Sequence, residues 1–318
     1  MTRLALAGIL GLLATGSPQV AAADPVAVPA TIVERARLEI QPAGRSFKQI
    51  TIDNPLGDVR VEGYDGTSIL IETRKSGPND EALDRLRISL VPNPDGTVRI
   101  KTTADGGREV QPLSRAAVRI DLLVRAPRDA RVEATSSSGT LEVLNMDAGG
   151  DLDTSSGRIS VKNVAGELST HSVSGATSLS QVFGSVDAQT LSSNLDLDSI
   201  GGERLVASVN RGTIAGRRVR SRIVELTTVD GNIVLEAESS LRGRLVVSSL
   251  KGNIDVRLRR NGVLLVRGRG TKVNLGATMQ TRSDGWVETQ LGQLVAGVTP
   301  ALVELRSRHG MVQFAIIE

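Results

Sequence analysis

The feature that most constrains the fold is a short turn motif that returns at nearly constant spacing between residues 131 and 260. The turn residues are 18, 18, 18, 19, 19 and 21 positions apart, and they are Gly139, Gly157, Gly175, Ser193, Gly212, Gly231 and Gly252. A period near 20 residues is typical of solenoids, in which each repeat stacks on the previous one. We therefore predict an all-β, β-helix-like solenoid with coils of about 18–19 residues.

Aligned on the turn residues, the repeats show columns of apolar side chains at alternating positions. The column two residues after the turn residue reads Leu141, Ile159, Thr177, Leu195, Ile214, Ile233 and Ile254. Further apolar columns lie four residues after the turn residue, and seven and five residues before it. Alternation with period two predicts two short strands in each repeat. An antiparallel sandwich also alternates, but it does not require constant spacing with matched columns.

Three other columns carry polar or small residues. The turn glycines are expected to supply a positive φ at a corner. Three positions before the turn residue most repeats carry Ser or Thr, whose hydroxyls should bond to one another or to the backbone. Five positions after the turn residue, an outer column of alternating charge predicts a ladder of ion pairs, formed by Asp198, Arg217, Glu236 and Arg257.

The first residues predict export. Residues 1–23 combine a basic start, an uncharged apolar run and the small residues Ala21 and Ala23, which is the pattern of a signal peptide cleaved before Asp24. After cleavage no stretch is long and apolar enough for a transmembrane helix. The chain has no cysteine, so it has no disulfide framework. We expect a periplasmic, extracellular or cell-surface protein.

Three further segments follow the signal peptide. Residues 24–46 are rich in Ala, Pro and Val and are expected to form a linker. Residues 47–130 alternate like strands but have no clear period; they include the hairpin motif PNPDG and a short helix capped by Asn79 or Asp80. Residues 131–318 are assigned to the repeat solenoid.

One long run gives the repeat a family resemblance. Residues 121–143 read DLLVRAPRDARVEATSSSGTLEV; repeated SG-x-I/L motifs follow, and the chain closes with VELRSRHGMVQFAI. This pattern resembles a bacterial envelope family of unknown function whose repeat domain is often labelled "putative adhesin". The resemblance covers roughly residue 47 to the C-terminus. It implies a β-solenoid exposed on or near the cell envelope, and it transfers no catalytic residue.

The composition excludes most catalytic sites. Without cysteine, and with only His171 and His309, the chain offers no thiolate nucleophile and no Cys/His zinc site. His171 belongs to an outward-facing column, so a solvated role is favoured over a catalytic triad. A polysaccharide lyase or hydrolase needs convergent carboxylates, but the candidates fall on different strands; they are Asp151, Asp153, Asp196 and Asp198. We predict no cofactor and no metal.

Charge gives the one suggestion of a binding site. Residues 132–210 have a balance of −7, from 3 basic and 10 acidic groups, whereas residues 211–272 have a balance of +9. The surplus arginines flank the connections between coils, and they are Arg218, Arg220, Arg222, Arg242, Arg244, Arg259 and Arg260. Stacking should bring them to one edge, where guanidinium groups suit phosphate or carboxylate groups.

These features predict a non-enzymatic, adhesin-like binding or structural module. The expected partner is an anionic envelope polysaccharide, a lipid headgroup or a neighbouring envelope protein. Aromatic stacking is expected to contribute little, because only Tyr64 and Trp286 look exposed, and nucleic acid is not an expected partner. Two alternatives stay open: a carbohydrate-active enzyme on a β-helix, and a scaffold or regulatory partner of a membrane protein.

Overall fold

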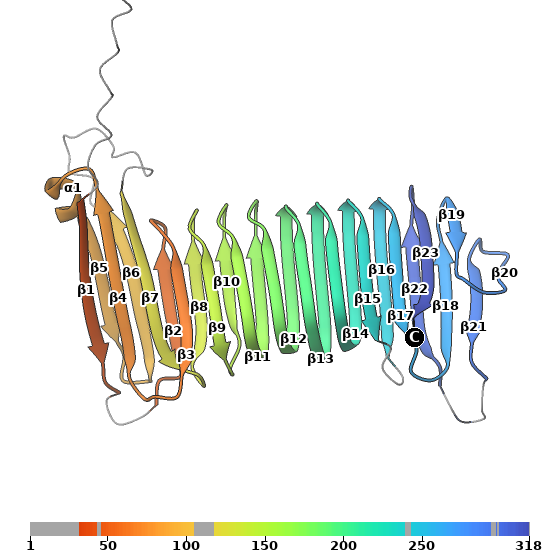
Figure 1. Cartoon of the computed structure of the whole chain (residues 1–318), viewed down its shortest axis with the longest axis horizontal. Coiled ribbons are helices and arrows are strands. Elements are labelled where there is room, and N and C mark those ends of the chain that lie inside the picture. Colours follow the sequence, from red (N-terminus) through yellow and green to blue (C-terminus); the bar gives the residue numbers. More distant parts are fainter. Residues whose placement is uncertain are drawn as a thin grey trace, which may run out of the picture. The chain divides into compact units, whose positions relative to one another are not determined.

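The described part of the chain is almost entirely β-strand, with a single short helix, so the all-β prediction is confirmed (Figure 1). The structure is a computed structural model that describes residues 32–42, 46–104, 118–238, 243–293, 297 and 299–317. The predicted signal peptide and its cleavage site lie outside these residues. No described helix is long and apolar enough to cross a membrane.

The elements fall into three groups along the chain. Before the repeat lie β1 (Ile32–Ile40), β2 (Gln49–Asn54), β3 (Val59–Tyr64), β4 (Ile69–Gly77), α1 (Asp80–Asp84), β5 (Leu86–Pro92), β6 (Thr97–Ala104) and β7 (Arg119–Pro127). The repeat contains β8 (Arg131–Ser136), β9 (Leu141–Met146), β10 (Gly150–Thr154), β11 (Ile159–Ser172), β12 (Thr177–Ser192), β13 (Leu195–Arg211), β14 (Ile214–Asp230), β15 (Ile233–Glu238), β16 (Arg244–Lys251) and β17 (Ile254–Arg259). The last group contains β18 (Leu264–Arg269), β19 (Lys272–Asn274), β20 (Gln280–Thr281), β21 (Val287–Leu291), β22 (Ala301–Ser307) and β23 (Met311–Ile317).

Parallel pairing arranges the repeat strands in two rows. In row A, β8 pairs with β10, and β10 pairs with the second half of β11. In row B, β9 pairs with the first half of β11. The long strands β11 to β14 run through both rows, and each pairs with the next along both halves. Every pairing joins equivalent positions of successive repeats, so the predicted columns are confirmed.

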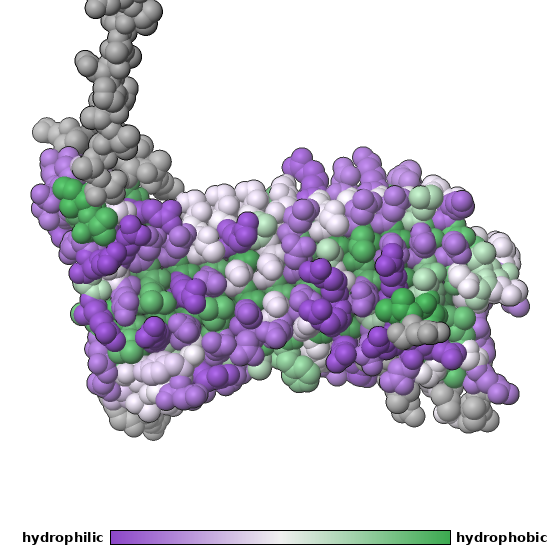
Figure 2. All heavy atoms as spheres, viewed as in Figure 1, coloured by the Kyte–Doolittle hydropathy of each residue, from purple (hydrophilic) through white to green (hydrophobic). Residues whose placement is uncertain are grey.

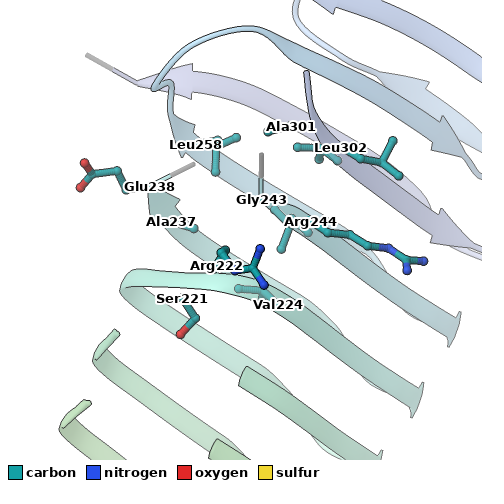
Figure 3. Close-up of a pocket in the computed structure, with 12 residues that line it drawn as sticks. Ser221, Arg222, Val224, Ala237, Glu238, Gly243, Arg244, Leu258, Ala301 and Leu302 are labelled. Atoms are coloured by element: carbon teal, nitrogen blue, oxygen red, sulfur yellow. The ribbon is translucent and has the colours of Figure 1, made fainter. Parts of the chain in front are cut away.

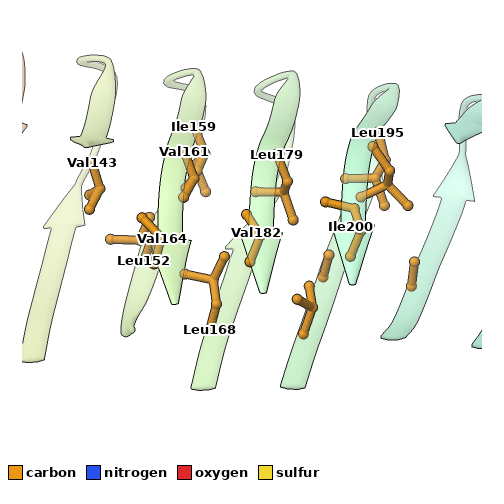
Figure 4. Packing of buried hydrophobic residues seen from close by; sticks show 14 of the residues in the cluster. Val143, Leu152, Ile159, Val161, Val164, Leu168, Leu179, Val182, Leu195 and Ile200 are labelled. Carbon is orange, nitrogen blue, oxygen red and sulfur yellow. The ribbon is translucent and has the colours of Figure 1, made fainter. Parts of the chain in front are cut away.

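The core lies between the two rows. Figure 4 shows side chains of both rows meeting there, among them Ile159 and Val161 from one row and Leu152 and Leu168 from the other. All four are at most 2% exposed. One buried column was absent from the sequence analysis. It lies seven residues after the turn residue and consists of Met146, Val164, Val182, Ile200 and Val219.

The hydroxyl column closes the turns that lead from row A to row B. Gly175 N–H donates to Ser172 Oγ at 2.9 Å, and Ser172 Oγ donates to the Gly175 carbonyl at 2.7 Å. Gly157 N–H likewise donates to Thr154 Oγ1 at 2.9 Å. Of the two predicted arrangements, bonding to the backbone is therefore the one found. In these repeats the buried hydroxyl holds its own turn, because it satisfies a turn amide that would otherwise be unpaired. Ser249 Oγ instead donates to the carbonyl of Gly231 in the preceding repeat, and Thr190 Oγ1 has no partner among the described residues.

The reason given for the turn glycines is wrong at most positions. Among these glycines only Gly212 and Gly252 have a positive φ, at 142° and 159°. What glycine permits is close stacking of the backbone. A Cβ on Gly175 would lie 1.5 Å from the carbonyl oxygen of Gly157, and a Cβ on Gly157 would lie 1.8 Å from that of Gly139. At these two turns glycine is therefore required, because the carbonyl of one turn occupies the space of the next turn's side chain; Ser193 shows that one turn of the column accommodates a side chain.

The positive φ values lie instead at the opposite edge, where the strand bends from row B to row A. We call this the bend edge, defined by residues 145–149, 163–167, 181–185, 199–203 and 218–222. One residue in each bend has φ between 53° and 58°, and these residues are Asn145, Asn163, Gln181, Ser199 and Arg218. Asparagine adopts this conformation more readily than most residues, and Asn163 Nδ2 also donates to Asn145 Oδ1 at 2.8 Å.

The segment before the repeat contains one repeat that the period search missed. β2 and β3 pair with β8 and β9 at a separation of 82 residues, so Asn54 takes the place of the hydroxyl residue and Gly57 that of the turn glycine. Asn54 Nδ2 donates to the carbonyl of Ile120 at 2.8 Å. The long separation hides this repeat, because the chain makes the excursion β4 to β7 before it returns.

The two local predictions for residues 47–130 are confirmed. Asn79 caps α1 by accepting a bond from Ala82 N–H at 2.8 Å, and β5 and β6 form the antiparallel hairpin around residues 92–96. The structure also places β1 inside the range expected to be a linker, paired antiparallel with β4. Charged and apolar residues alternate along β1, but most of its side chains are exposed. β1 therefore contributes no column of buried side chains, which is the pattern that predicted the other strands.

The chain folds back at its C-terminal end. β22 lies between β16 and β18, and β23 lies between β17 and β19. The final strand-turn-strand is therefore an internal layer, and residues 264–293 lie beyond it. Gly310 completes the glycine column, because a Cβ there would lie 1.9 Å from the carbonyl oxygen of Gly252.

The buried column predicts a large difference between two neighbouring substitutions. Ile233 is 0% exposed and pairs in register with Ile214 and Ile254. We expect Ile233→Asp to lower the free energy of unfolding by several kcal/mol, because it buries a carboxyl group in an apolar column. Asn232→Asp should cost far less, since a carboxylate can still accept the bond that Asn232 Oδ1 receives from Asn253 N–H. Urea unfolding of both variants measures the difference.

The glycine column makes a second prediction about stability. Gly175→Ala should cost about 3 kcal/mol or more, because the new methyl group collides with backbone that cannot move without shifting the next turn. Ser174→Ala is the matched control, because Ser174 is exposed and loses only one bond to the Ser155 carbonyl. Equal midpoints of thermal unfolding for these two variants would contradict the close-approach explanation.

Candidate functional site

The structure places the predicted arginines at the bend edge. Arg218, Arg220 and Arg222 lie in the bend of β14, where the strand passes from row B to row A. Arg244 begins β16 at the same edge, where it pairs with Ile223 just after that bend. Two more members follow at the end of β17, and they are Arg259 and Arg260. Arg242 lies outside the described residues.

Three of these arginines are paired with carboxylates of neighbouring repeats. Arg218 bridges to Asp198, Arg220 Nε lies 3.0 Å from Glu238 Oε2, and Arg222 bridges to Glu203. All three guanidinium groups stay at least half exposed. Exposed pairs of this kind contribute little to stability, so the arginines are neutralised without being locked in place.

The Arg222–Glu203 pair shifts the titration of both groups. Arg222 Nε lies 2.9 Å from Oε1 and 3.0 Å from Oε2 of Glu203. The hydrogen bond from Arg222 is the main cause that lowers the pKa of Glu203, and the same bond raises the pKa of Arg222. Because the pKa of Glu203 is depressed, any stabilisation from this pair is present above the ordinary glutamate pKa and is lost as the pH falls through the lowered value.

Two of the three alignments of the predicted ion ladder form, but none of its predicted ion pairs forms among the described residues. The registers place Arg217 beside Asp198 and Arg257 beside Glu236, as the alignment required. However, Arg218 rather than Arg217 bonds to Asp198, and Arg257 lies 3.9 Å from Asp255. The register between β13 and β14 is intact at this point, but Arg218 lies in the bend with a φ of 53°, and its Nε also donates to Ser199 Oγ at 2.8 Å. Alignment alone could not show that Arg218 is the partner of Asp198.

An exposed aromatic ring at the bend edge was missed by the sequence analysis. Phe183 is 69% exposed, and its ring lies over Gly201, where an added Cβ would approach it to 3.0 Å. The ring borders a hollow of about 390 Å³ whose wall includes Gly202, Arg218 and Arg220. The available signal was its position: Phe183 directly follows the buried Val182 and so points away from the core.

The two aromatic residues that looked exposed in the sequence are only partly so. Tyr64 is half-buried, and its hydroxyl lies 2.8 Å from both the carbonyl oxygen and the Oγ of Ser68. Trp286 is half-buried near the far end of the stack, where it borders a separate hollow with Arg267 and Arg282. Neither residue lines the hollow beside Phe183, so Phe183 is the aromatic side chain that accompanies Arg218 and Arg220.

A second cavity lies beside Arg222 and Arg244. Figure 3 shows both arginines with Ser221, Glu238 and Leu258 around it. Its volume is about 20 Å³, which is room for one water molecule rather than for a sugar or a phosphate ester. Ser221 Oγ is buried beside it without a hydrogen-bond partner in the described structure.

The carboxylates that an enzyme would need do not converge. Asp151 and Asp153 belong to β10 in row A, whereas Asp196 and Asp198 belong to the first half of β13 in row B. Within the described residues, no group of three or more His, Asp or Glu side chains could hold a metal ion. His171 is exposed, as its outward-facing column predicted.

The surface shows no single dominant apolar patch on the face in Figure 2. Hydrophilic side chains are spread over this face and separate smaller hydrophobic areas. Exposed apolar residues occur on several repeats, among them Val173, Leu191, Val229, Val234 and Leu250. The hollow beside Phe183 differs from these areas because it combines an aromatic ring with two guanidinium groups.

Comparison with known proteins finds similar structures but no similar sequence. The sequence matches no protein-family model and no curated protein. Solved structures described as adhesins are similar to this chain. A "putative adhesin" from Parabacteroides distasonis is 10% identical with a TM-score of 0.44, over 89% of this chain and 97% of that chain.

Two further solved structures show how the TM-score varies among these matches. A "putative lipid binding protein" from Parabacteroides distasonis is 11% identical with a TM-score of 0.39, over 90% of this chain and 97% of that chain. A "putative cell adhesion protein" from Clostridium sporogenes is 9% identical with a TM-score of 0.28, over 90% of this chain and 100% of that chain. The adhesin label agrees with the family resemblance in the sequence, but likeness this distant assigns no function.

The ion pairs at the bend edge predict a measurable titration shift. Arg222→Gln should raise the pKa of Glu203 toward its ordinary value, because the substitution removes the hydrogen bond and the charge that lower it. NMR titration of the Glu203 carboxyl group measures the change. Arg217→Gln is the control, since Arg217 forms no ion pair with the described residues; an equal shift in that variant would contradict the assigned pair.

Proposed function

We propose that this chain is a non-enzymatic, exported binding module of the adhesin-like type, built as a β-solenoid. Parallel registers that advance by one repeat at each step support the solenoid, in which β8–β9 and each following strand pair form one coil. The signal peptide pattern of residues 1–23 supports export to the periplasm or the cell surface. The acidic pairs Asp151/Asp153 and Asp196/Asp198 lie in different rows, and this separation supports a role without catalysis.

The observation that carries a binding role is the hollow beside Phe183. One face of the exposed ring is available to stack on the C–H face of a sugar, and the glycines at positions 201 and 202 leave room beside it. Arg218 and Arg220 place two guanidinium forks next to the ring, and such forks bind carboxylate or phosphate groups in a bidentate manner. This combination fits an anionic polysaccharide of the envelope.

The ion pairs of the arginines are compatible with this ligand. The Arg220 side chain is 65% exposed although it contacts Glu238, so an incoming carboxylate can replace Glu238 at little cost. Further arginines continue along the same edge, where coils stack about 4.8 Å apart. A polymer that lies along the bend edge would therefore meet repeated cationic groups, contributed by Arg222, Arg244, Arg259 and Arg260.

Two other functions remain as alternatives. A carbohydrate-active enzyme would require a carboxylate pair in one cleft, and the carboxylates beside the bend of β14, Asp198, Glu203 and Glu238, are each paired with an arginine. A scaffold or regulatory partner of a membrane protein would use the same exposed edge without needing a polymer ligand. Binding to a purified polymer separates this last alternative from the proposal.

The binding role predicts loss of polymer affinity when the aromatic ring is removed. Phe183→Ala should weaken binding to polygalacturonate about tenfold, which corresponds to ~1.4 kcal/mol. Arg220→Glu should weaken it further because it reverses a charge beside the ring. Calorimetric titration with polygalacturonate, and with neutral dextran for comparison, measures both effects.

The matched control for this experiment is Val234→Ala, which removes an apolar side chain 48% exposed on β15, away from the hollow. Its affinity should equal that of the unmodified protein. Affinity should also fall as added salt screens the guanidinium groups. Unchanged affinity of Phe183→Ala, or binding that ignores salt, would refute polymer recognition at this edge and leave the scaffold alternative.

A further inference from the structure

Two arginines face each other across neighbouring strands on the outer surface of row B, far along the sequence from the bend-edge arginines. β1 pairs antiparallel with β4, and their register places Arg35 directly opposite Arg74. Side chains at directly opposed positions point to the same face with Cβ atoms ~4.5–5.5 Å apart. The inner face at this point is closed, since the neighbouring Thr73 is 5% exposed. Both arginines are exposed on the outer face.

Neither arginine has a carboxylate partner among the described residues, although carboxylates lie near. Arg37, two residues further along β1, pairs with Glu72, with its Nε 3.8 Å from Oε1 of the carboxylate. Asp121 lies opposite Arg74 on β7, but its Oδ1 accepts from Arg119 Nε at 2.9 Å and from Asp58 N–H at 3.1 Å. The local carboxylates are therefore engaged, and the two opposed guanidinium groups are left without a counter-charge.

A broad groove contains this pair. Its volume is about 650 Å³, and it crosses the outer surface of β1, β4, β7 and the start of β3. Arg60 lies on its far wall and is held by Glu142 at 2.8 Å. Leu123 gives the floor an apolar part. The unpaired positive charge is thus concentrated on the side of the groove formed by β1 and β4.

We propose that Arg35 and Arg74 form a binding site for an oxyanion, a phosphate or sulfate group. Like charges placed directly opposite each other destabilise a strand pair, so without a bound anion the two arginines disfavour the β1–β4 contact. A tetrahedral oxyanion between the two guanidinium groups accepts hydrogen bonds from both and converts this repulsion into attraction. The anion then joins β1 to β4 and stabilises the attachment of β1.

This site is separate from the proposed polymer contact at the bend edge. The width of the groove also admits a phosphate or sulfate group that is carried on a larger molecule. A free anion and an anionic group on a larger molecule present the same kind of oxygen atoms to the two arginines. The choice of probe therefore distinguishes the two sources: inorganic phosphate in one experiment and dextran sulfate in the other.

Thermal unfolding with and without phosphate tests the proposal. The unmodified protein should gain stability when millimolar phosphate replaces chloride at constant ionic strength, because the anion binds the folded state. Arg74→Gln should lose that gain. In chloride alone the same variant should unfold at the same temperature as the unmodified protein or higher, because the repulsion between Arg35 and Arg74 is gone. Arg35→Gln should behave alike, which provides an independent variant on the other strand.

The control is Arg99→Gln, on β6 in row A, where the cross-strand neighbours of Arg99 are Thr51 and Val91. This variant should keep the full response to phosphate, and so should Phe183→Ala. A response to dextran sulfate without one to phosphate, lost in Arg74→Gln, assigns the site to a carried group. No response to either anion, a response that Arg74→Gln retains, or a lower unfolding temperature of Arg74→Gln in chloride would overturn the proposal.

Discussion

The whole repeat depends on direct contact between the backbones of successive turns. The carbonyl oxygen of one turn glycine lies where the next would carry its Cβ, which leaves no freedom in the spacing of neighbouring repeats at this edge. The hydroxyl three residues earlier holds the turn in the shape that this contact needs. Backbone hydrogen bonds between successive turns, such as the one from Ser174 N–H to the Ser155 carbonyl at 2.9 Å, keep the turns together. The strands on both sides therefore keep one register, and each buried side chain stacks on its counterpart.

The same stacking determines how charge is arranged. Residues 18 to 21 apart in sequence become neighbours, so most ion pairs at the bend edge join one repeat to the next, as Arg222 does with Glu203. An excess of arginine in the sequence therefore does not mean an excess of unpaired positive charge on the surface. Arg35 and Arg74 lack carboxylate partners among the described residues, and there the register opposes two like charges.

The repeat could be predicted because period and alternation act on every coil at once. Ile214 and Ile233 could be assigned to one column from spacing alone, and Asn79 could be assigned as a cap from local chemistry. The coil formed by β2 and β3 could not, since 82 residues separate it from its neighbour. The conformation of the bends was also hidden, because Gln181 and Arg218 give no local sign of a positive φ.

The candidate site was predictable in outline and not in detail. The sequence located arginines beside the connections between coils, and the structure puts the described ones at one edge. It could not show which carboxylate each arginine contacts, because Arg218, which bends with a positive φ, bonds to Asp198 although the register aligns Arg217 with that carboxylate. Phe183 was overlooked because a single aromatic residue outside the apolar columns has no periodic signal. Its importance depends on Gly201 of the next repeat, which lies beneath the ring.

The position of β22 and β23 has a consequence for the order of assembly. These strands separate β16 and β17 from β18 and β19, yet they follow all four strands in the sequence. Residues 264–293 therefore have no partner row to attach to until residues 301–317 have left the ribosome. The repeats made earlier can stack one upon another during synthesis, whereas β18 and β19 must wait for strands made after them. β22 and β23 are inserted after their neighbours have been made, and within the described structure β18 and β19 pair with the stack only through them.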